Sequence, residues 1–257
     1  MVRGDAKKGC EGVRDRVCIV TGASQGLGLA IADKFVQDGH RVVFISRHVD
    51  PVKTRFVAEL EREQVRFINL DVSDYTGIQR CAADIVEQWG RIDILVNNAG
   101  LRTETAIEEM TVEEWERIMA VNLGSTFFFS QAVLPAMKKQ RWGRIINMSS
   151  FGGQVGPLTS SAAYAASKAG QIALTKSFAR SLAAYGITVN AVAPASVRTP
   201  EMDKIPPEAL AKMVESIPIG RVGEAVEVAE LVAYLISDYG GFVTGATFDI
   251  NGGRLMR

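Results

Sequence analysis

The sequence predicts a single α/β domain, a doubly wound parallel sheet of seven strands with helices on both faces. Three observations support this: short β-branched, apolar runs recur along the chain, amphipathic segments separate them, and a glycine-rich turn follows the first run. Runs that are apolar at nearly every position are typical of parallel strands, which are buried on both faces. Regular alternation of strand and helix indicates right-handed crossovers within one continuous sheet.

The expected strands are the apolar runs Arg16–Val20, Arg41–Ile45, Val65–Leu70, Ile92–Asn97, Arg144–Met148, Ile187–Val192 and Ala246–Ile250. The expected helices are Gln25–Asp38, Tyr75–Trp89, Val112–Lys139, Ala163–Tyr185 and Ala225–Ser237. Thr111 and Glu114 have the spacing of a capping box at the start of the third of these helices. No linker or internal repeat interrupts the pattern, so residues 15–257 are expected to form one domain.

Composition narrows the classes of function. Lys and Arg together number 29 and Asp and Glu also number 29, so no basic excess is present to neutralise a phosphate backbone. Nucleic acid is therefore not an expected partner. The three cysteines, Cys10, Cys18 and Cys81, form no CxxC motif and are expected to be reduced thiols. His40 and His48 are the only histidines and belong to no metal-binding motif, so no metal is expected.

Residues 1–14 are rich in glycine and charge and lack the apolar segment of a signal peptide, which predicts a mobile tail. No later apolar run reaches membrane-spanning length. We therefore expect no membrane contact and a cytoplasmic location.

Residues 195–223 form a second irregular segment, which carries four of the prolines around the short helical piece PEALAKMVES. The segment is longer than an ordinary connection between a strand and a helix. It is expected to be a lid that closes over a bound ligand, and a surface insertion without a role is the alternative.

The glycine-rich turn TGASQGLG spans Thr21 to Gly28, between the first strand and the first helix. Gly22 suits the tight turn, Gly26 allows the backbone to approach a pyrophosphate, and Gly28 allows the helix to lie close to the sheet. The helix N-terminus then offers N–H groups and a positive dipole end to phosphates. A P-loop is excluded because no Gly-Lys-Ser/Thr follows.

Ligands of such sheets bind beyond the carboxyl ends of the strands, where small, polar and turn-forming residues follow nearly every run. These are Ser46-Arg47, Asp71-Val72, Asn97-Asn98-Ala99-Gly100, Ser149-Ser150 and Pro194. Tyr164 and Lys168 follow the fifth strand at helical spacing, so both side chains lie on one face of their helix. The tyrosine and the lysine are therefore expected at the same edge of the sheet.

Together the motifs TGASQGLG, NNAG, VNLGS, NMSS, YAASK and INGG resemble those of the short-chain dehydrogenase/reductases, across essentially the whole chain after the tail. The resemblance implies a Rossmann fold, a nicotinamide cofactor and the catalytic residues Asn122, Ser150, Tyr164 and Lys168. The cofactor-binding residues that it implies are Gly22, Ser24, Gln25, Gly26, Leu27, Gly28, Ser46, Arg47, Asp71, Val72, Asn98, Ala99, Gly100, Tyr164, Lys168, Pro194, Val197 and Thr199. Two features depart from the family: the loop between Ser150 and Tyr164 is one residue longer, and Pro194-Ala195 stands where Pro-Gly is usual.

The chemistry implied is interconversion of a carbonyl and a secondary alcohol. Hydride transfer to a ketone builds negative charge on oxygen, which must be stabilised and protonated. Tyr164 would be the proton donor, with its pKa lowered from about 10 by the Lys168 ammonium. By the resemblance, Ser150 would donate a hydrogen bond to the same oxygen, Lys168 would hold the nicotinamide ribose, and Asn122 would hold a water that refills the proton.

The residue pair after the second strand predicts the cofactor. An NAD-selective site usually has Asp or Glu there, but this chain has Ser46 and Arg47. A guanidinium pairs with the 2′-phosphate of NADP, whereas a carboxylate would repel it. We expect NADPH to be preferred, with Arg47 responsible for most of the discrimination, because Gln25 adds no charge. The alternative is that Arg47 is an ordinary surface arginine.

The most similar branch is the 3-oxoacyl-carrier-protein reductases, which dock an acidic carrier protein on basic residues. Arg141 matches one of these, but Tyr185 stands at the position of another. A free small ketone, sugar or polyol is therefore the alternative substrate, and a non-catalytic dinucleotide sensor is a remote alternative. The family also implies a homotetramer, formed through the helices that carry Phe127 and Tyr164, unless all three phenylalanines of Thr126–Phe129 face the sheet.

Overall fold

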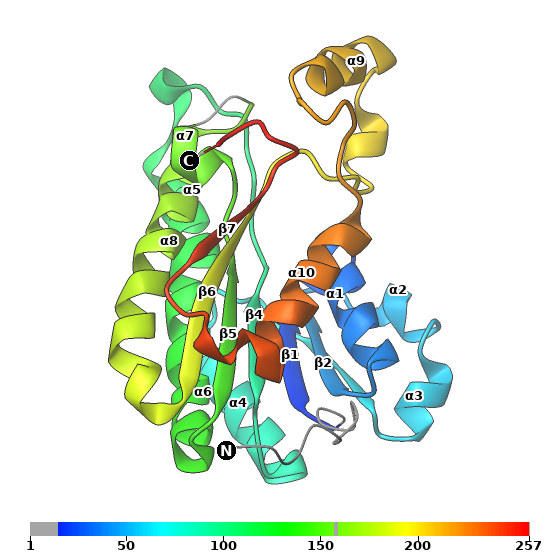
Figure 1. Ribbon diagram of the computed structural model, residues 1–257, viewed down its shortest axis with the longest axis vertical. Coiled ribbons are helices and arrows are strands. Elements are labelled where there is room, and N and C mark those ends of the chain that lie inside the picture. The colour runs from blue at the N-terminus through cyan, green and yellow to red at the C-terminus, as the bar shows by residue number, and fades with distance from the viewer. Residues whose placement is uncertain (1–14, 157–158, 257) are drawn as a thin grey trace, which may run out of the picture.

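The computed structural model describes residues 15–156 and 159–256, and it confirms the predicted parallel seven-stranded sheet. The strand order is β3-β2-β1-β4-β5-β6-β7 (Figure 1). The strands are β1 (Val17–Thr21), β2 (Arg41–Ser46), β3 (Val65–Asn69), β4 (Ile94–Asn97), β5 (Gly143–Met148), β6 (Ile187–Pro194) and β7 (Thr247–Ile250). The order reverses between β1 and β4, which places a ligand-binding crevice at the carboxyl ends of these strands. The tail expected over residues 1–14 lies outside the described residues.

Two hydrophobic layers cover the sheet, because successive side chains of a strand point to opposite faces. Cys18 and Val20 of β1 pack with α1 (Gly26–Gln37), α10 (Ala225–Ile236) and the short α2 (Asp50–Lys53). Val17 and Ile19 pack on the other face, whose helices are α4 (Tyr75–Trp89), α6 (Ser125–Gln140) and α8 (Ala162–Leu182). Two further short helices are α3 (Val57–Glu61) and α7 (Gly152–Val155).

The predicted helix Val112–Lys139 is interrupted in the structure. It begins as α5 (Val112–Met119), passes through a π-helical turn at Ala120–Gly124 and continues as α6. The Tyr75 hydroxyl contacts this turn and donates to the carbonyl of Ala120 at 3.4 Å. A side chain at position 124 would collide with that hydroxyl, so Gly124 allows the approach. The turn holds Asn122, and π-helical turns are frequent at functional sites.

The start of this helix matches the predicted capping box only in part. Thr111 caps it, since its hydroxyl accepts a hydrogen bond from the backbone of Glu114 at 3.1 Å. The Glu114 carboxylate does not complete the box, because it accepts from the hydroxyl of Thr105.

The continuous helical stretch Val112–Gln140 is also long and apolar enough to cross a bilayer by length and composition, which the sequence reasoning missed. Its α6 part packs against α4 and against the strands β4 and β5, as a core helix does, and its α5 part packs against α8.

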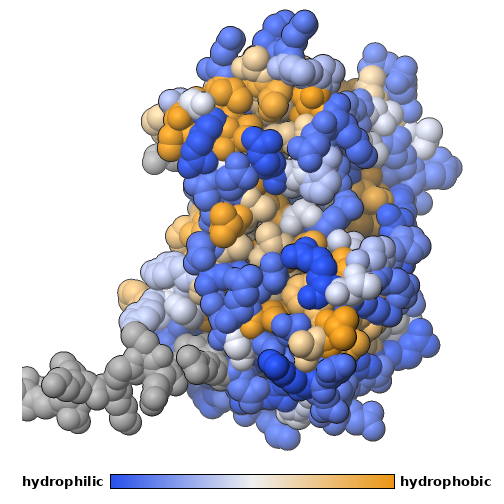
Figure 2. Space-filling view, turned by 90° about the vertical axis from the view of Figure 1, so that its right-hand side faces the viewer, coloured by the Kyte–Doolittle hydropathy of each residue, from blue (hydrophilic) through white to orange (hydrophobic). Residues whose placement is uncertain are grey.

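Residues 195–223 stand beyond the carboxyl edge of the sheet and contain α9 (Pro207–Glu215). They have a small core of their own, in which Met202, Ile217 and Val222 are buried together. Figure 2 shows apolar side chains gathered at the end of the molecule that α9 occupies. The segment contacts the glycine turn, because Gln25 donates to the Glu201 carboxylate at 2.6 Å.

The three phenylalanines of α6 occupy different environments. Phe129 is fully buried against the sheet, whereas Phe127 is 37% exposed. Phe128 lies between them and stacks on Tyr75, with ring centroids 4.2 Å apart. The interpretation in which all three face the sheet is therefore wrong.

Replacing Phe129 by alanine is expected to lower the free energy of unfolding by about 3–5 kcal/mol, because the change leaves a cavity in a packed core. Chemical denaturation of Phe129→Ala measures this loss. Val226→Ala, at an exposed position of α10, is the control and should cost far less. Equal losses for the two variants would contradict the assigned packing.

Candidate active site

The glycine turn forms a cradle at the N-terminus of α1. Gly22 has φ +66°, and a Cβ there would lie 2.9 Å from the Cα of Ala99. A Cβ at Gly28 would overlap the carbonyl oxygen of Gly22. No side chain caps the first turn of α1, and that turn carries no acidic residue. The free N–H groups and the positive dipole end fit a pyrophosphate, as the sequence predicted for a dinucleotide.

Asn98 supports this cradle from the neighbouring strand end. Its side-chain amide donates to the carbonyl of Thr21 at 2.9 Å and to that of Gly22 at 3.3 Å. In return, the Thr21 hydroxyl accepts from the backbone N–H groups of Asn98 and Ala99. The NNAG motif therefore fixes the shape of the glycine turn.

The end of β2 carries the residues predicted to read the cofactor ribose. The Ser46 hydroxyl lies 3.0 Å from that of Ser24, which ties the end of β2 to the glycine turn. Arg47 is exposed, and its side chain forms no ion pair or hydrogen bond within residues 15–156 and 159–256. Its guanidinium is thus free to pair with an anion.

Asp71, after β3, is occupied by protein partners. Arg117 of α5 forms an ion pair with it at 2.7 Å, and the backbone and hydroxyl of Ser73 also donate to it. Partial burial raises the pKa of Asp71, but these hydrogen bonds outweigh it and lower the pKa to about 2. The carboxylate is therefore ionised at neutral pH and held in one position. Val72 beside it is buried.

Tyr164 and Ser150 meet at the carboxyl edge of the sheet. Tyr164 lies in the first turn of α8, whose N-cap Ser161 accepts from the backbone of Tyr164 and contacts the hydroxyl of Thr103. Ser150 follows β5, and a Cβ at Gly152 would be 3.6 Å from its hydroxyl oxygen and 4.0 Å from the Tyr164 ring. The glycine leaves both hydroxyl-bearing side chains open to a ligand.

The pKa of the Tyr164 phenol is raised, contrary to the lowered value expected from the sequence. Burial is the largest cause, while hydrogen bonding by Ser150 and the charge of Arg102 lower the pKa in part. The Lys168 ammonium lies 5.8 Å from the centre of the Tyr164 ring and donates elsewhere. Its influence on the phenol is consequently small in this structure.

Lys168 is buried, and two oxygens hold its ammonium. Nζ donates to the carbonyl of Met148 at 2.6 Å and to the side-chain oxygen of Gln171 at 3.1 Å. Burial lowers the pKa of Lys168 to about 8. Gly100 leaves space in front of it, because a Cβ there would be 3.6 Å from Nζ. The third N–H has no partner among the described residues and is available to a ligand.

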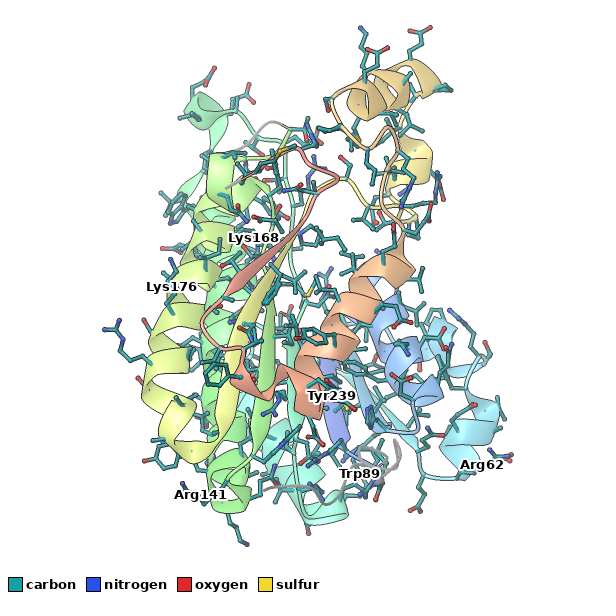
Figure 3. The ribbon with its side chains drawn as sticks, in the orientation of Figure 1. Arg62, Trp89, Arg141, Lys168, Lys176 and Tyr239 are labelled. Atoms are coloured by element: carbon teal, nitrogen blue, oxygen red, sulfur yellow. The ribbon has the colours of Figure 1, made fainter. Side chains whose placement is uncertain are left out.

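Asn122 lies behind the site in the π-helical turn. Its side chain exchanges two hydrogen bonds with the backbone of Leu101, at 2.7 and 2.9 Å, and donates to the hydroxyl of Ser167. Its main-chain oxygen accepts from the side chains of Thr126 and Gln171. The four predicted catalytic residues thus lie within one connected region, which Figure 3 locates by Lys168.

The segment after β6 completes the edge. Pro194 ends the strand, its carbonyl accepts from the backbone of Phe151, and Val197 is buried. Thr199 reaches the glycine turn, because a Cβ at Gly26 would lie 3.6 Å from its methyl group. Within the described chain, no group of three or more His, Cys, Asp or Glu side chains is placed to hold a metal ion.

Comparison with known proteins identifies the family. The family model described as Enoyl-(Acyl carrier protein) reductase matches residues 22–254. The 3-oxoacyl-[acyl-carrier-protein] reductase FabG of Thermotoga maritima is 39% identical to this chain over 244 residues. The match covers 94% of this chain and 98% of that reductase. The acetoacetyl-CoA reductase of Shinella zoogloeoides is 37% identical over 242 residues, and the match covers 94% of this chain and 99% of that reductase.

A solved structure shows the same fold. The crystal structure of gox2181 matches with a TM-score of 0.87 and 34% identity, covering 94% of this chain and 96% of that one. The chain belongs to the short-chain dehydrogenase/reductase family. It is therefore an oxidoreductase that acts on carbonyl and alcohol groups, and the interpretation as a non-catalytic sensor is set aside.

Sequence reasoning missed three residues that contact the site: Arg117, Arg102 and Gln171. Arg117 pairs with Asp71 and Arg102 acts on Tyr164. Both partners are distant in sequence, so no local pattern predicted these contacts. The contact of Gln171 with Lys168 could have been predicted, because Gln171 follows Lys168 by three positions and therefore lies on the same helix face.

Proposed function

We propose that this enzyme reduces the 3-oxo group of an acyl thioester to a secondary alcohol with NADPH, in the cytoplasm. The observation that supports the proposal is the naming of two relatives, each matched over 94% of the chain. One is named for reduction of a 3-oxoacyl group on acyl-carrier protein, and the other for reduction of acetoacetyl-CoA. Acyl-carrier protein and coenzyme A both present the acyl group as a thioester. A free sugar or polyol is less well supported, because none of these relatives is named for one.

The residues at the edge of the sheet suit this reaction. A bound nicotinamide would supply a hydride to the carbonyl carbon, and negative charge would then develop on the substrate oxygen as the carbonyl π bond breaks. Ser150 donates a hydrogen bond to that oxygen and Tyr164 transfers its proton to it. The one Lys168 N–H that the protein leaves unheld would contact the cofactor ribose and would be the source of the proton that returns to Tyr164. Asn122 fixes the loop after β4 against α8, which keeps the site in shape.

The preference for NADPH is supported by the charge at the end of β2. Arg47 is exposed and unpaired in the described chain, and no Asp or Glu directly follows β2. Ser24 and Ser46 add two hydroxyl groups next to it. This combination suits a 2′-phosphate and lacks the carboxylate that would bind a ribose hydroxyl.

Residues 195–223 are proposed as the lid. Their own hydrophobic cluster allows them to move as a unit, and the hydrogen bond between Gln25 and Glu201 joins them to the phosphate cradle. Closure there would exclude water from the reacting atoms.

A homotetramer is part of the proposal. A groove of about 520 Å³ runs along α5 and α6, lined by apolar side chains that include Trp115, Leu123 and Phe127. Trp115 and Phe127 are both exposed in the single chain, and burial against a second copy would remove them from water. Light scattering at micromolar concentration that gave the mass of one chain would refute this assembly.

Docking of an acidic carrier protein would use the basic side chains near the end of α6. The Arg141 guanidinium donates to the carbonyl of Ala184, and Lys138 lies 4.6 Å over the ring of Tyr185. Figure 3 has Arg141 at the end of the sheet opposite Lys168. These basic groups would reach a catalytic site only in a neighbouring copy of the chain.

The reaction is tested by following NADPH oxidation with acetoacetyl-CoA, an acetoacetyl-carrier protein, crotonyl-CoA and simple cyclic ketones. The two 3-oxo thioesters are expected to be reduced, and their relative rates distinguish the two carriers. Crotonyl-CoA tests a second candidate, reduction of an enoyl double bond, which the description of the family model favours. Turnover of crotonyl-CoA alone would overturn the proposed 3-oxo substrate.

Tyr164→Phe is expected to lower kcat by about two to four orders of magnitude, because only the proton donor is removed. NADPH affinity, measured by fluorescence titration, should stay nearly unchanged. Tyr234→Phe, at an exposed position of α10, is the matched control and should leave kcat intact. Near-normal kcat in Tyr164→Phe would show that the tyrosine is not the acid.

Arg47→Ala is expected to weaken NADPH binding about thirtyfold, the effect of losing one charge-assisted contact, with little change for NADH. Dissociation constants for both cofactors measure this. Arg62→Ala removes another exposed arginine, at the end of α3, and should change neither constant. Equal affinity of the wild type for both cofactors, or equal losses in Arg47→Ala, would contradict the assignment.

A further inference from the structure

A chain of buried side chains joins Lys168 to the π-helical turn. Gln171 accepts from Lys168 Nζ at 3.1 Å with its side-chain oxygen. Its side-chain nitrogen donates to the main-chain oxygen of Asn122 at 3.0 Å and to the Thr126 hydroxyl at 2.7 Å. The Thr126 hydroxyl itself donates to the same Asn122 oxygen at 2.8 Å. All four residues are buried, and Gln171 is fully so.

The groups at the two ends of Gln171 determine which kind of side chain can join them. An ammonium only donates, and a main-chain carbonyl only accepts. A side chain that bridges the two must therefore accept at one end and donate at the other, as a carboxamide does. A leucine at position 171 could make neither contact, and a methionine offers only a weak thioether acceptor and no donor. An ionised glutamate could not donate to Asn122. The orientation of the Gln171 amide follows from its two neighbours.

We infer that Gln171 is a positioning residue for the reaction, which fixes the Lys168 ammonium relative to Tyr164 and couples it to the π-helical turn. The inference rests on the proposed function for its catalytic consequence, but the contact itself is a property of the protein without cofactor. Gln171 carries no proton in this account. With Met148 and Gln171 holding two N–H groups, the third is directed to the ligand side.

The charged groups around Lys168 and Gln171 show why their contact affects the protonation of Lys168. Tyr164 faces Lys168 from the same helix, and Arg102, from the loop after β4, acts on the phenol. Burial is the one cause of the lowered Lys168 pKa, so among the described residues no carboxylate offsets its desolvation. The Gln171 oxygen is one of only two acceptors there that stabilise the charged form. Its loss would favour the neutral amine.

Gln171→Met removes this acceptor with little change of volume. The titration of the Lys168 amine is followed in the cofactor-free protein by NMR of ¹⁵N-labelled lysine side chains, with the signal assigned by its loss in Lys168→Met. The midpoint is expected to fall by about one pH unit relative to the wild type, as for one charge-assisted hydrogen bond. Above the new midpoint, kcat/KM for reduction should fall about tenfold.

Thr175→Val is the matched control. Its hydroxyl lies on the same helix in the same buried network, where it donates to the Gln171 main-chain oxygen and accepts from Asn147, without contacting Lys168. This variant should lose stability but keep the wild-type midpoint. An unchanged midpoint in Gln171→Met, or an equal shift in Thr175→Val, would overturn the inference.

Thr126→Val keeps the test decisive if Gln171→Met does not fold. This variant removes one of the two acceptors that hold the Gln171 amide, so a smaller downward shift is expected, and no shift would count against the inference. A wild type that reduces no carbonyl would refute the proposed function instead, while the NMR titration would still decide the role of Gln171.

Discussion

The buried ammonium of Lys168 is the interaction on which the site depends. A cation removed from water is costly unless oxygens replace the lost hydration, and here a strand-end carbonyl and a carboxamide do so. The carbonyl is that of Met148, where β5 ends. The carboxamide is that of Gln171, which follows Lys168 by about one turn of α8. Because neither partner carries a charge, the amine keeps a pKa low enough to exchange protons near neutral pH.

The interruption of the long helix belongs to the same network. The main-chain oxygen of Asn122, in the π-helical turn, accepts from the side chains of Thr126 and Gln171. The Asn122 side chain holds Leu101. The turn thereby links the loop after β4 to α8, which carries Tyr164 and Lys168. Gly124, with Tyr75 against it, makes the local widening possible.

Much of this architecture could be predicted from sequence, because it depends on local patterns. Apolar runs located the strands to within a few residues, and the glycines of residues 21–28 predicted a cradle whose close contacts with Asn98 and Ala99 the structure displays. The π-helical turn could not be predicted, since no local pattern marks it and its contact with Tyr75 comes from another helix. The direction predicted for the Tyr164 pKa was wrong for a similar reason. Burial raises this pKa, and the helical spacing of Tyr164 and Lys168 reveals neither that burial nor the oxygens of Met148 and Gln171 that hold the ammonium.

The dependence of wild-type kcat/KM on pH, for reduction of a 3-oxo thioester, tests the central role of the buried amine most directly. Lys168 has its pKa lowered by burial to about 8, so the ammonium is present below that pH and lost above it. Since kcat/KM reports the free enzyme, it should be constant below about pH 8 and fall about tenfold per pH unit above it. A rate that stayed constant up to the ordinary lysine value of 10.5 would contradict the account.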